Sequence, residues 1–259
     1  MLKKYFGNKG FYKAVLSLLI PIVVQQFISS FVSLLDNIMV GGLGVEAISS
    51  ASIANSVLMV FNLAIFGGLS GAGIFGAQFY GKGDMEGMMH TFRFKMILST
   101  LVTAIAITIY LLFGEAFIQS FLEGESNGGD MALALQGGKD YLTIMLWGLL
   151  PFAVVQTYSG TLREAGETVV PMVAGILAIL TNLFLNWVLI YGKFGLPAMG
   201  VRGAALATVI AQVVNLSVIL IQAKVKRDPF VFSYKKHFIW TKESVREYFI
   251  KCFLHTKSW

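Results

Sequence analysis

The sequence predicts an all-α membrane protein, a bundle of six transmembrane helices. Three observations predict this class. The chain is 56% hydrophobic and only 13% charged, which is about half the charged fraction of an ordinary soluble domain. Its charged residues are gathered into short segments that separate six long charge-free runs. Finally, nearly all of its lysines and arginines fall in every second one of the segments that separate or flank these runs.

Each charge-free run is long enough to cross a hydrocarbon core about 30 Å thick, which takes ~20 helical residues. The runs are continuously apolar, which favours helices over the strands of a membrane barrel, where apolar and polar residues alternate. We therefore expect one transmembrane helix in each of the stretches 14–35, 47–81, 96–114, 141–162, 168–192 and 203–223.

The basic residues predict the orientation of the bundle. If the amino terminus is cytoplasmic, every lysine and arginine lies on the cytoplasmic side except Lys139, Lys193 and Arg202. Such an asymmetry is typical of proteins of the cytoplasmic membrane. The net charge of +6 thus indicates topology and contact with an anionic lipid bilayer, and we expect no nucleic acid as a partner.

Three segments follow from this pattern. Residues 1–13 are basic and aromatic and predict a cytoplasmic interfacial segment, residues 14–223 form the six-helix lobe, and residues 224–259 form a cytoplasmic linker. The first helix is too long for a signal peptide and no small-residue cleavage site follows it, so we expect it to be retained. The single cysteine, Cys252, excludes a disulfide within the chain.

Two connections are expected to be long. Residues 80–95 predict a solvated cytoplasmic loop that carries His90, and residues 115–141 predict an acidic outer segment. In the second helix, Gly67 and Gly71 form a G-x-x-x-G pair, and Gly68 begins a second row of small residues with the same spacing. Small residues four apart allow helix backbones to approach closely in lipid, so both rows predict helix packing.

Asp36 is the only charged residue between positions 14 and 45. A carboxylate at the centre of a membrane helix costs roughly 2.5–3.5 kcal/mol on insertion scales and usually faces a cavity where ions or substrate are handled. Asn182 and Asn186, four residues apart on the fifth helix, share one face of it. We hypothesise that Asp36, with these two amides as partners, binds a proton or a small cation.

Other polar residues recur at helical spacing and are candidates for lining a cavity. A buried amide is costly unless it is hydrogen-bonded, so these stripes should point at one another or at water. The alternative is that the serine, threonine and glutamine side chains only hold the helices together, at roughly 0.6 kcal/mol per contact. The candidates are Gln25, Ser29, Ser33, Asn55, Gln156, Thr208 and Gln212, and Pro21 is the candidate position for a bend in the first helix.

Five segments of the chain together resemble the multidrug and toxic compound extrusion (MATE) family of efflux transporters. The resemblance is carried by LIPIVVQQFISSFVSLLDNIMVGGLG (19–44), AQFYGKGD (77–84), SGTLREAGET (159–168), TNLFLNWVLIYG (181–192) and GLPAMGVRGAALATVIAQ (195–212), in this order along the chain.

The resemblance implies one lobe of a twelve-helix antiporter that exchanges protons or sodium ions for small cationic or amphipathic compounds, without a cofactor. It implies that Asp36 is a cation or proton site, and that Asn182 and Asn186 stand where members often have Asn-x-x-x-Asp. The second position is an amide here, which weakens a two-carboxylate mechanism and leaves Asp36 as the sole acid of the lobe. Pro21 matches a proline at which the first helix of some members bends.

Members of the family have about twelve helices, so six predict an amino-terminal half, interpreted as a truncated and inactive fragment unless it pairs with a second six-helix lobe. In this interpretation residues 224–259 are the cytoplasmic linker and the truncated start of the second lobe. Two alternatives stay open. A lipid-linked saccharide flippase of the same superfamily would need basic cavity residues, which the membrane interior does not offer. A non-transporting assembly subunit would be indifferent to Asp36→Asn. A membrane enzyme is disfavoured because no paired acids or histidines lie at membrane depth.

Overall fold

The computed structural model of the protein describes residues 8–124 and 131–225, with side chains for 8–120 and 132–225. Within these ranges the chain forms helices and no strand, as predicted. All of the helices are long and apolar enough to cross a membrane. They are α1 (Lys9–Gly41), α2 (Val45–Gly81), α3 (Met85–Gly124), α4 (Met131–Glu164), α5 (Val169–Tyr191) and α6 (Val201–Val225).

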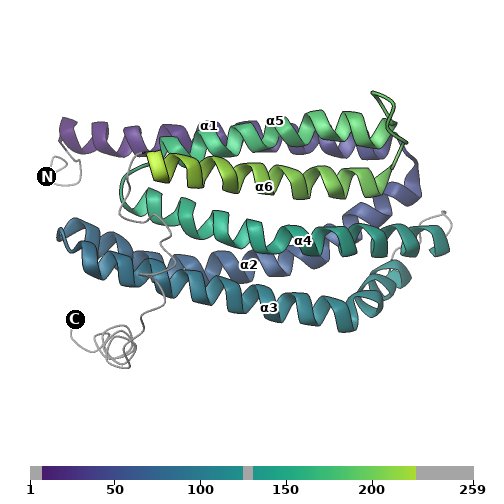
Figure 1. The fold of residues 1–259 in the computed structure, drawn as a ribbon, viewed down its shortest axis with the longest axis horizontal. Coiled ribbons are helices and arrows are strands. Elements are labelled where there is room, and N and C mark those ends of the chain that lie inside the picture. The colour runs from purple at the N-terminus through teal and green to yellow at the C-terminus, as the bar shows by residue number, and fades with distance from the viewer. Residues whose placement is uncertain (1–7, 125–130, 226–259) are drawn as a thin grey trace, which may run out of the picture.

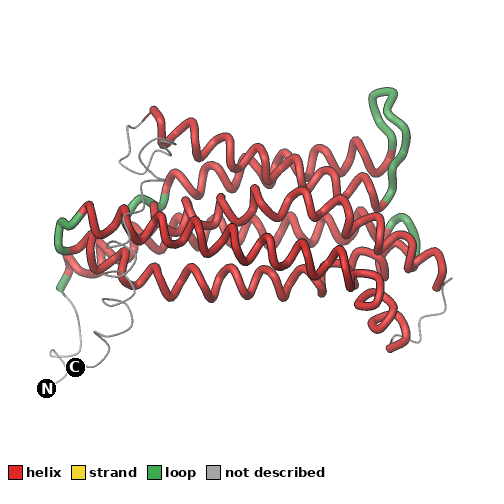
Figure 2. Tube along the Cα trace, turned by 60° about the horizontal axis from the view of Figure 1, so that its bottom comes forward, coloured by secondary structure: helices red, strands yellow, loops and turns green. Residues whose placement is uncertain are grey.

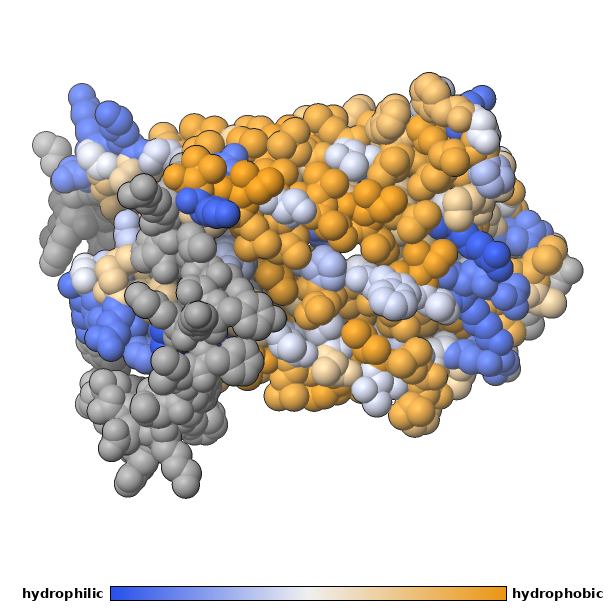
Figure 3. Space-filling view, viewed as in Figure 1, coloured by the Kyte–Doolittle hydropathy of each residue, from blue (hydrophilic) through white to orange (hydrophobic). Residues whose placement is uncertain are grey.

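The helices run up and down along one common direction (Figure 1). One end of the bundle, here called the amino-terminal end, holds the start of α1 and the α2–α3 and α4–α5 turns. The opposite end holds the α1–α2 turn and the α5–α6 loop, and Figure 2 shows loops only at these two ends. On the face shown in Figure 3, the middle of the molecule is mostly apolar, with a few more polar patches, and hydrophilic residues gather at both ends. This is the surface expected of a protein that spans a bilayer.

Helix α4 lies at the centre and packs against α2, α3 and α6, while α5 packs against α6 and α1. The core between them is formed by residues such as Phe61, Leu149 and Ala153. Close approach depends on small residues: a Cβ on Gly203 of α6 would overlap the backbone of α5 at Leu189. Helix α1 is the least covered helix of the bundle.

Except for α5, the helices are longer than the charge-free runs. Residues 80–95 were predicted as a loop, but only the turn between Gly81 and Met85 is not helical, and His90 lies half-buried on α3, 3.8 Å from Glu86. Most of the predicted outer segment is also helical, since α3 continues to Gly124 and α4 begins at Met131. Charged residues at the ends of membrane helices face water without ending the helix, so charge alone underestimates helix length.

The prediction for the glycines of α2 is half wrong. A Cβ on Gly67 or Gly71 would meet nothing within 4 Å, so this G-x-x-x-G pair packs against no described helix. Gly68 does lie against Leu98 of α3, and Gly76 lies against Glu164 of α4. The two rows differ by about 100° around the helix, and only the second faces the bundle. Pro21 lies within α1, which is helical on both sides of it.

Some predictions lie outside the described residues. They concern most of the linker 224–259, the first part of the interfacial segment 1–13 and the middle of the acidic segment 115–141.

Candidate functional site

The side chain of Asp36 faces α5. Its carboxylate accepts a hydrogen bond from the amide of Asn186, whose side chain is completely buried. Asp36 itself is half-buried. None of the ion pairs among the described side chains includes it. The structure therefore holds this acid against a neutral partner, with no fixed cation to balance its charge.

A chain of hydrogen bonds runs from Asp36 across α5 to α6. The amide of Asn186 also donates to Oδ1 of Asn182, at 3.3 Å, and the amide of Asn182 donates to Oγ1 of Thr208, at 3.1 Å. The hydroxyl of Thr208 donates to the backbone carbonyl of Ala204. Oδ1 of Asn186 is buried and has no hydrogen-bond partner. Oxygen atoms of one carboxylate and two amides thus gather at this point, and oxygen is the ligand that hard cations prefer.

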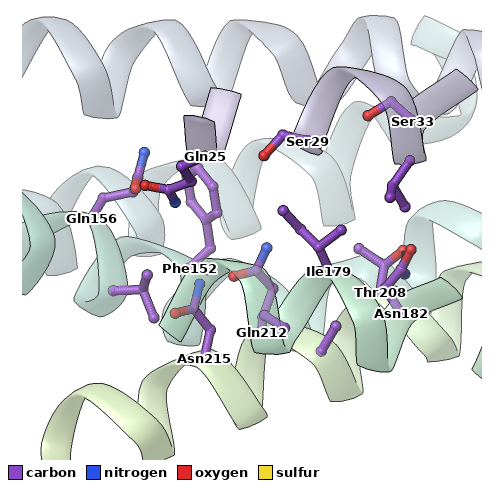
Figure 4. Close-up of a pocket in the computed structure, with 15 residues that line it drawn as sticks. Gln25, Ser29, Ser33, Phe152, Gln156, Ile179, Asn182, Thr208, Gln212 and Asn215 are labelled. Atoms are coloured by element: carbon purple, nitrogen blue, oxygen red, sulfur yellow. Dashed lines mark hydrogen bonds between the residues drawn. The ribbon is translucent and has the colours of Figure 1, made fainter. Parts of the chain in front are cut away.

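A cavity of about 320 Å³ lies beside this chain, between α1, α4, α5 and α6. Its size is at the lower end of the range for small-molecule sites. In Figure 4, Ser29 and Ser33 of α1 point into the same space as Gln212 and Asn215 of α6. The polar residues that line this first cavity are Gln25, Ser29, Ser33, Gln156, Asn182, Thr208, Gln212 and Asn215.

A second cavity of about 340 Å³ lies between α2, α4 and α6. It is lined by Asn55 and Asn62 of α2 and shares Phe152, Thr208 and Gln212 with the first cavity. The hydroxyl of Tyr141 lies 3.5 Å from Oδ1 of Asn55. The two cavities thus meet at one aromatic ring and two polar side chains.

The structure brings most of the predicted residues together. All the candidates for lining a cavity do so, with Asn55 in the second cavity and the others in the first. Asp36 and Asn186 lie beyond the lining of both cavities, and Asn182 connects them to the first. The lining residues that sequence reasoning left out of the site include Phe152 and Gly175, because an aromatic residue or a glycine in a membrane helix carries no signal of its own.

Two charged residues lie where none was expected. Lys95, predicted in a cytoplasmic loop, is only 1% exposed, and its Nζ lies 2.9 and 2.7 Å from the two carboxylate oxygens of Glu164. Asp36 was expected to be the sole acid of the lobe, but Glu164 is a second acid held inside the bundle. The expectation that no basic residue lines a cavity is not contradicted, because Lys95 lines neither cavity. The ion pair between Lys95 and Glu164 could not be recognised in the sequence because the two residues are 69 positions apart.

The fold and the site define the class: a helical membrane protein with polar cavities and an acid that has no fixed counter-charge among the described residues. The MatE family model matches residues 21–188. The chain belongs to this family, the MATE transporters that its motifs resemble.

Two curated relatives are described as probable multidrug resistance proteins. The chain is 28% identical over 220 residues to a probable multidrug resistance protein NorM of Thermotoga maritima, covering 84% of this chain and 45% of that protein. It is 30% identical over 219 residues to a probable NorM of Agrobacterium fabrum, with the same coverage. The chain thus spans about half the length of the curated relatives it matches.

Solved structures agree with this. A crystal structure of MATE in complex with MaD5 has a TM-score of 0.77 at 26% identity, over 92% of this chain and 51% of that one. An outward-facing conformation of a multidrug resistance MATE family transporter of the MOP superfamily has a TM-score of 0.74 at 26% identity, over 92% and 50%. The six helices therefore have the fold of the matched half of a MATE transporter.

Proposed function

We propose that the chain works as the amino-terminal lobe of a cation-coupled multidrug efflux antiporter. In this proposal Asp36, Asn186 and Asn182 bind the coupling ion, and the two cavities contact the exported compound. One observation carries it: Asp36 is bonded to a buried amide, has no fixed cation among the described residues and is linked by two hydrogen bonds to the cavity wall. An acid held in this way is available to a mobile positive ion.

The coupling ion is a proton or a sodium ion. Sodium would be coordinated by the Asp36 carboxylate and by the amide oxygens of Asn182 and Asn186, one of which has no other partner. A proton would sit on Asp36 alone. Either ion can drive export, because one charge that crosses 100 mV releases about 2.3 kcal/mol.

The proposed substrates are small cationic or amphipathic compounds. Support comes from the lining of the cavities, which combines neutral amides and hydroxyls with apolar side chains and includes no lysine or arginine. The buried Lys95 points at Glu164 and lines neither cavity. A flippase for an anionic saccharide lipid would be expected to place basic groups there.

We further propose that the lobe acts together with a second six-helix lobe, since the relatives it matches are about twice its length. The protein would lie in the cytoplasmic membrane with its amino terminus inside, as the distribution of basic residues favours.

Ion binding can be tested on the purified chain, independently of transport. A ligand that binds only the folded state stabilises it by about 2.7 kcal/mol at a hundred times its Kd. We expect sodium chloride, compared with choline chloride at constant ionic strength and pH, to raise the Tm of the parent protein and not that of Asp36→Asn. A rise in both would assign the effect to salt in general. No sodium effect in either, together with a pH dependence of Tm that Asp36→Asn abolishes, would point to a proton.

Transport is the second test. Dye efflux should be measured in cells that express the chain alone or together with a carboxy-terminal lobe taken from one of the relatives. Efflux that depends on Asp36 in either case supports the proposal. If Asp36→Asn leaves efflux and every other phenotype intact, the chain is an assembly subunit instead.

A further inference from the structure

Helix α1 joins the rest of the bundle at Gln25. Between Asn8 and Val24 every residue is exposed except Pro21, which is half-buried. In Figure 1, α1 and the α2–α3 hairpin extend beyond the point where α4 and α6 end. The first half of α1 is thus uncovered by the described chain, and Gln25 is its first polar contact with another helix.

Gln25 is held from two sides. Its Oε1 accepts a hydrogen bond from Nη2 of Arg163, at 3.1 Å. On the other side its amide group lies directly against Gly175 of α5, where a Cβ would overlap Nε2. Packing between α1 and α4 is otherwise sparse, because the first cavity separates them. The contact with Arg163 therefore bridges α1 and α4 at one edge of that cavity.

The direction of Arg163 is fixed by its neighbour. Glu164 lies against Gly73 and Gly76 of α2, and both of its oxygens bind the buried Lys95 of α3. Successive residues of a helix point about 100° apart. With Glu164 anchored between α2 and α3, the side chain of Arg163 is directed to the side of α4 that faces α1.

We propose that Arg163 is a positioning residue that holds Gln25, and with it the middle of α1, against α4, and so closes the first cavity at its amino-terminal edge. Nε of Arg163 is buried without a partner, so the bridge consists of one hydrogen bond from a charged group. Such a bond shifts an equilibrium by about tenfold or more. It is strong enough to favour the closed arrangement and weak enough to open during a transport cycle.

The proposal concerns access to the cavity and does not depend on the role of Asp36. It can be tested by accessibility of a cysteine introduced by Ser29→Cys, since Ser29 lines the first cavity. The background is Cys252→Ser, which removes the one natural cysteine. The full chain is reconstituted into vesicles, where it takes both orientations, and a membrane-impermeant maleimide is added outside. The labelling rate is measured for the molecules whose amino terminus faces the reagent.

We expect Arg163→Gln and Gln25→Ala each to raise the labelling rate about tenfold. The double variant should label no faster than either single variant, because both remove the same bond. Gln25→Glu should lower the rate, since it turns the bridge into an ion pair. A change in this direction cannot come from partial unfolding. Gln25→Ala leaves the Lys95–Glu164 pair untouched and carries the test even if the Arg163 variant fails to assemble.

Two controls accompany the measurement. Arg202→Gln removes an arginine that binds a carboxylate at the opposite end, and it should leave the labelling rate within about twofold of the parent's, well short of the change expected for one charged hydrogen bond. A cysteine introduced by Lys82→Cys, in the exposed α2–α3 turn, should label equally in every background. The proposal is overturned if Gln25→Ala leaves the labelling of the Ser29 position unchanged, or if Gln25→Glu raises it.

Discussion

Asp36 and Glu164 both hold a carboxylate inside the bundle, and the two differ in what balances their charge. Glu164 binds Lys95 with both of its oxygens, and the lysine is almost completely buried. Asp36 binds a neutral amide of Asn186 and takes part in no ion pair of the described chain. A fixed cation makes the first carboxylate part of the framework, whereas the second can accept a positive ion that comes and goes.

The difference shows why burial of a charge alone does not identify a functional site. A buried ion pair strongly resists the loss of one partner, because the other is left as an uncompensated charge. A carboxylate with neutral partners has no such dependence. The same chemical change, acid to amide, should therefore have different effects at the two sites. At Glu164 it should lower the stability of the protein, and at Asp36 it should remove the response to the ion.

The largest effect is expected for Glu164→Gln. It leaves the ammonium of Lys95 buried without a counter-charge, and breaking a buried pair in this way costs about 3–5 kcal/mol. The free energy of unfolding, measured by denaturant titration in detergent micelles, should fall by that amount.

The matched control for this prediction is Glu164→Gln combined with Lys95→Met, which removes both charges. It should recover most of the lost stability, because a buried pair replaced by neutral residues is often close to neutral in free energy. A double variant as unstable as the single one would mean that the pair contributes packing, and the comparison between the two carboxylates would lose its basis.

A smaller loss is expected for Gly76→Ala. A Cβ there would overlap the carboxylate of Glu164, and forcing atoms into a packed site costs about 1–3 kcal/mol. The same change at Gly71, in the row that meets no described helix, is the control and should not destabilise the protein. Thermal unfolding of the two variants, compared with the parent, measures the difference. Equal losses at both positions would contradict the packing described for α2.

Asp36→Asn should change the free energy of unfolding by about 1 kcal/mol or less, since an amide oxygen can still accept the hydrogen bond from Asn186. Denaturant titration in a sodium-free buffer gives the value to compare with that of Glu164→Gln. A loss as large as at Glu164 would mean that Asp36 is a structural carboxylate after all, with a cation partner that the described residues do not include.

Much of this architecture could be predicted from the sequence. Six charge-free runs give six helices, and the four-residue spacing of Asn182 and Asn186 places both on the face that carries the chain from Asp36 to Thr208. Periodicity along one helix identifies a polar face, which is why the candidates for lining a cavity do line one.

The Lys95–Glu164 pair and the Arg163–Gln25 contact could not be predicted, because they depend on how separate helices are rotated against each other. Single-sequence patterns describe each helix and leave these rotations open. Lys95 and Arg163 also stand at the edges of charge-free runs, where a charge normally indicates a loop. The row of small residues that begins at Gly68 and ends at Gly76, against Glu164, was visible in the sequence, but without its partner it indicated packing only.

The smallest effect is expected at the opposite end of the bundle, for Arg202→Gln. Arg202 of α6 donates to Asp140 of α4 at 2.9 and 2.7 Å, a geometry as good as that of Lys95 with Glu164. Its side chain is 58% exposed, however, against 1% for Lys95. Water and salt screen an exposed pair, whose contribution is about 0–1 kcal/mol. Unfolding in low and in high salt should show a small loss that vanishes as ionic strength rises, while the loss in Glu164→Gln persists. If both losses responded alike to salt, burial would not be what separates the two pairs, and Glu164 would have to be regarded as accessible to solvent ions.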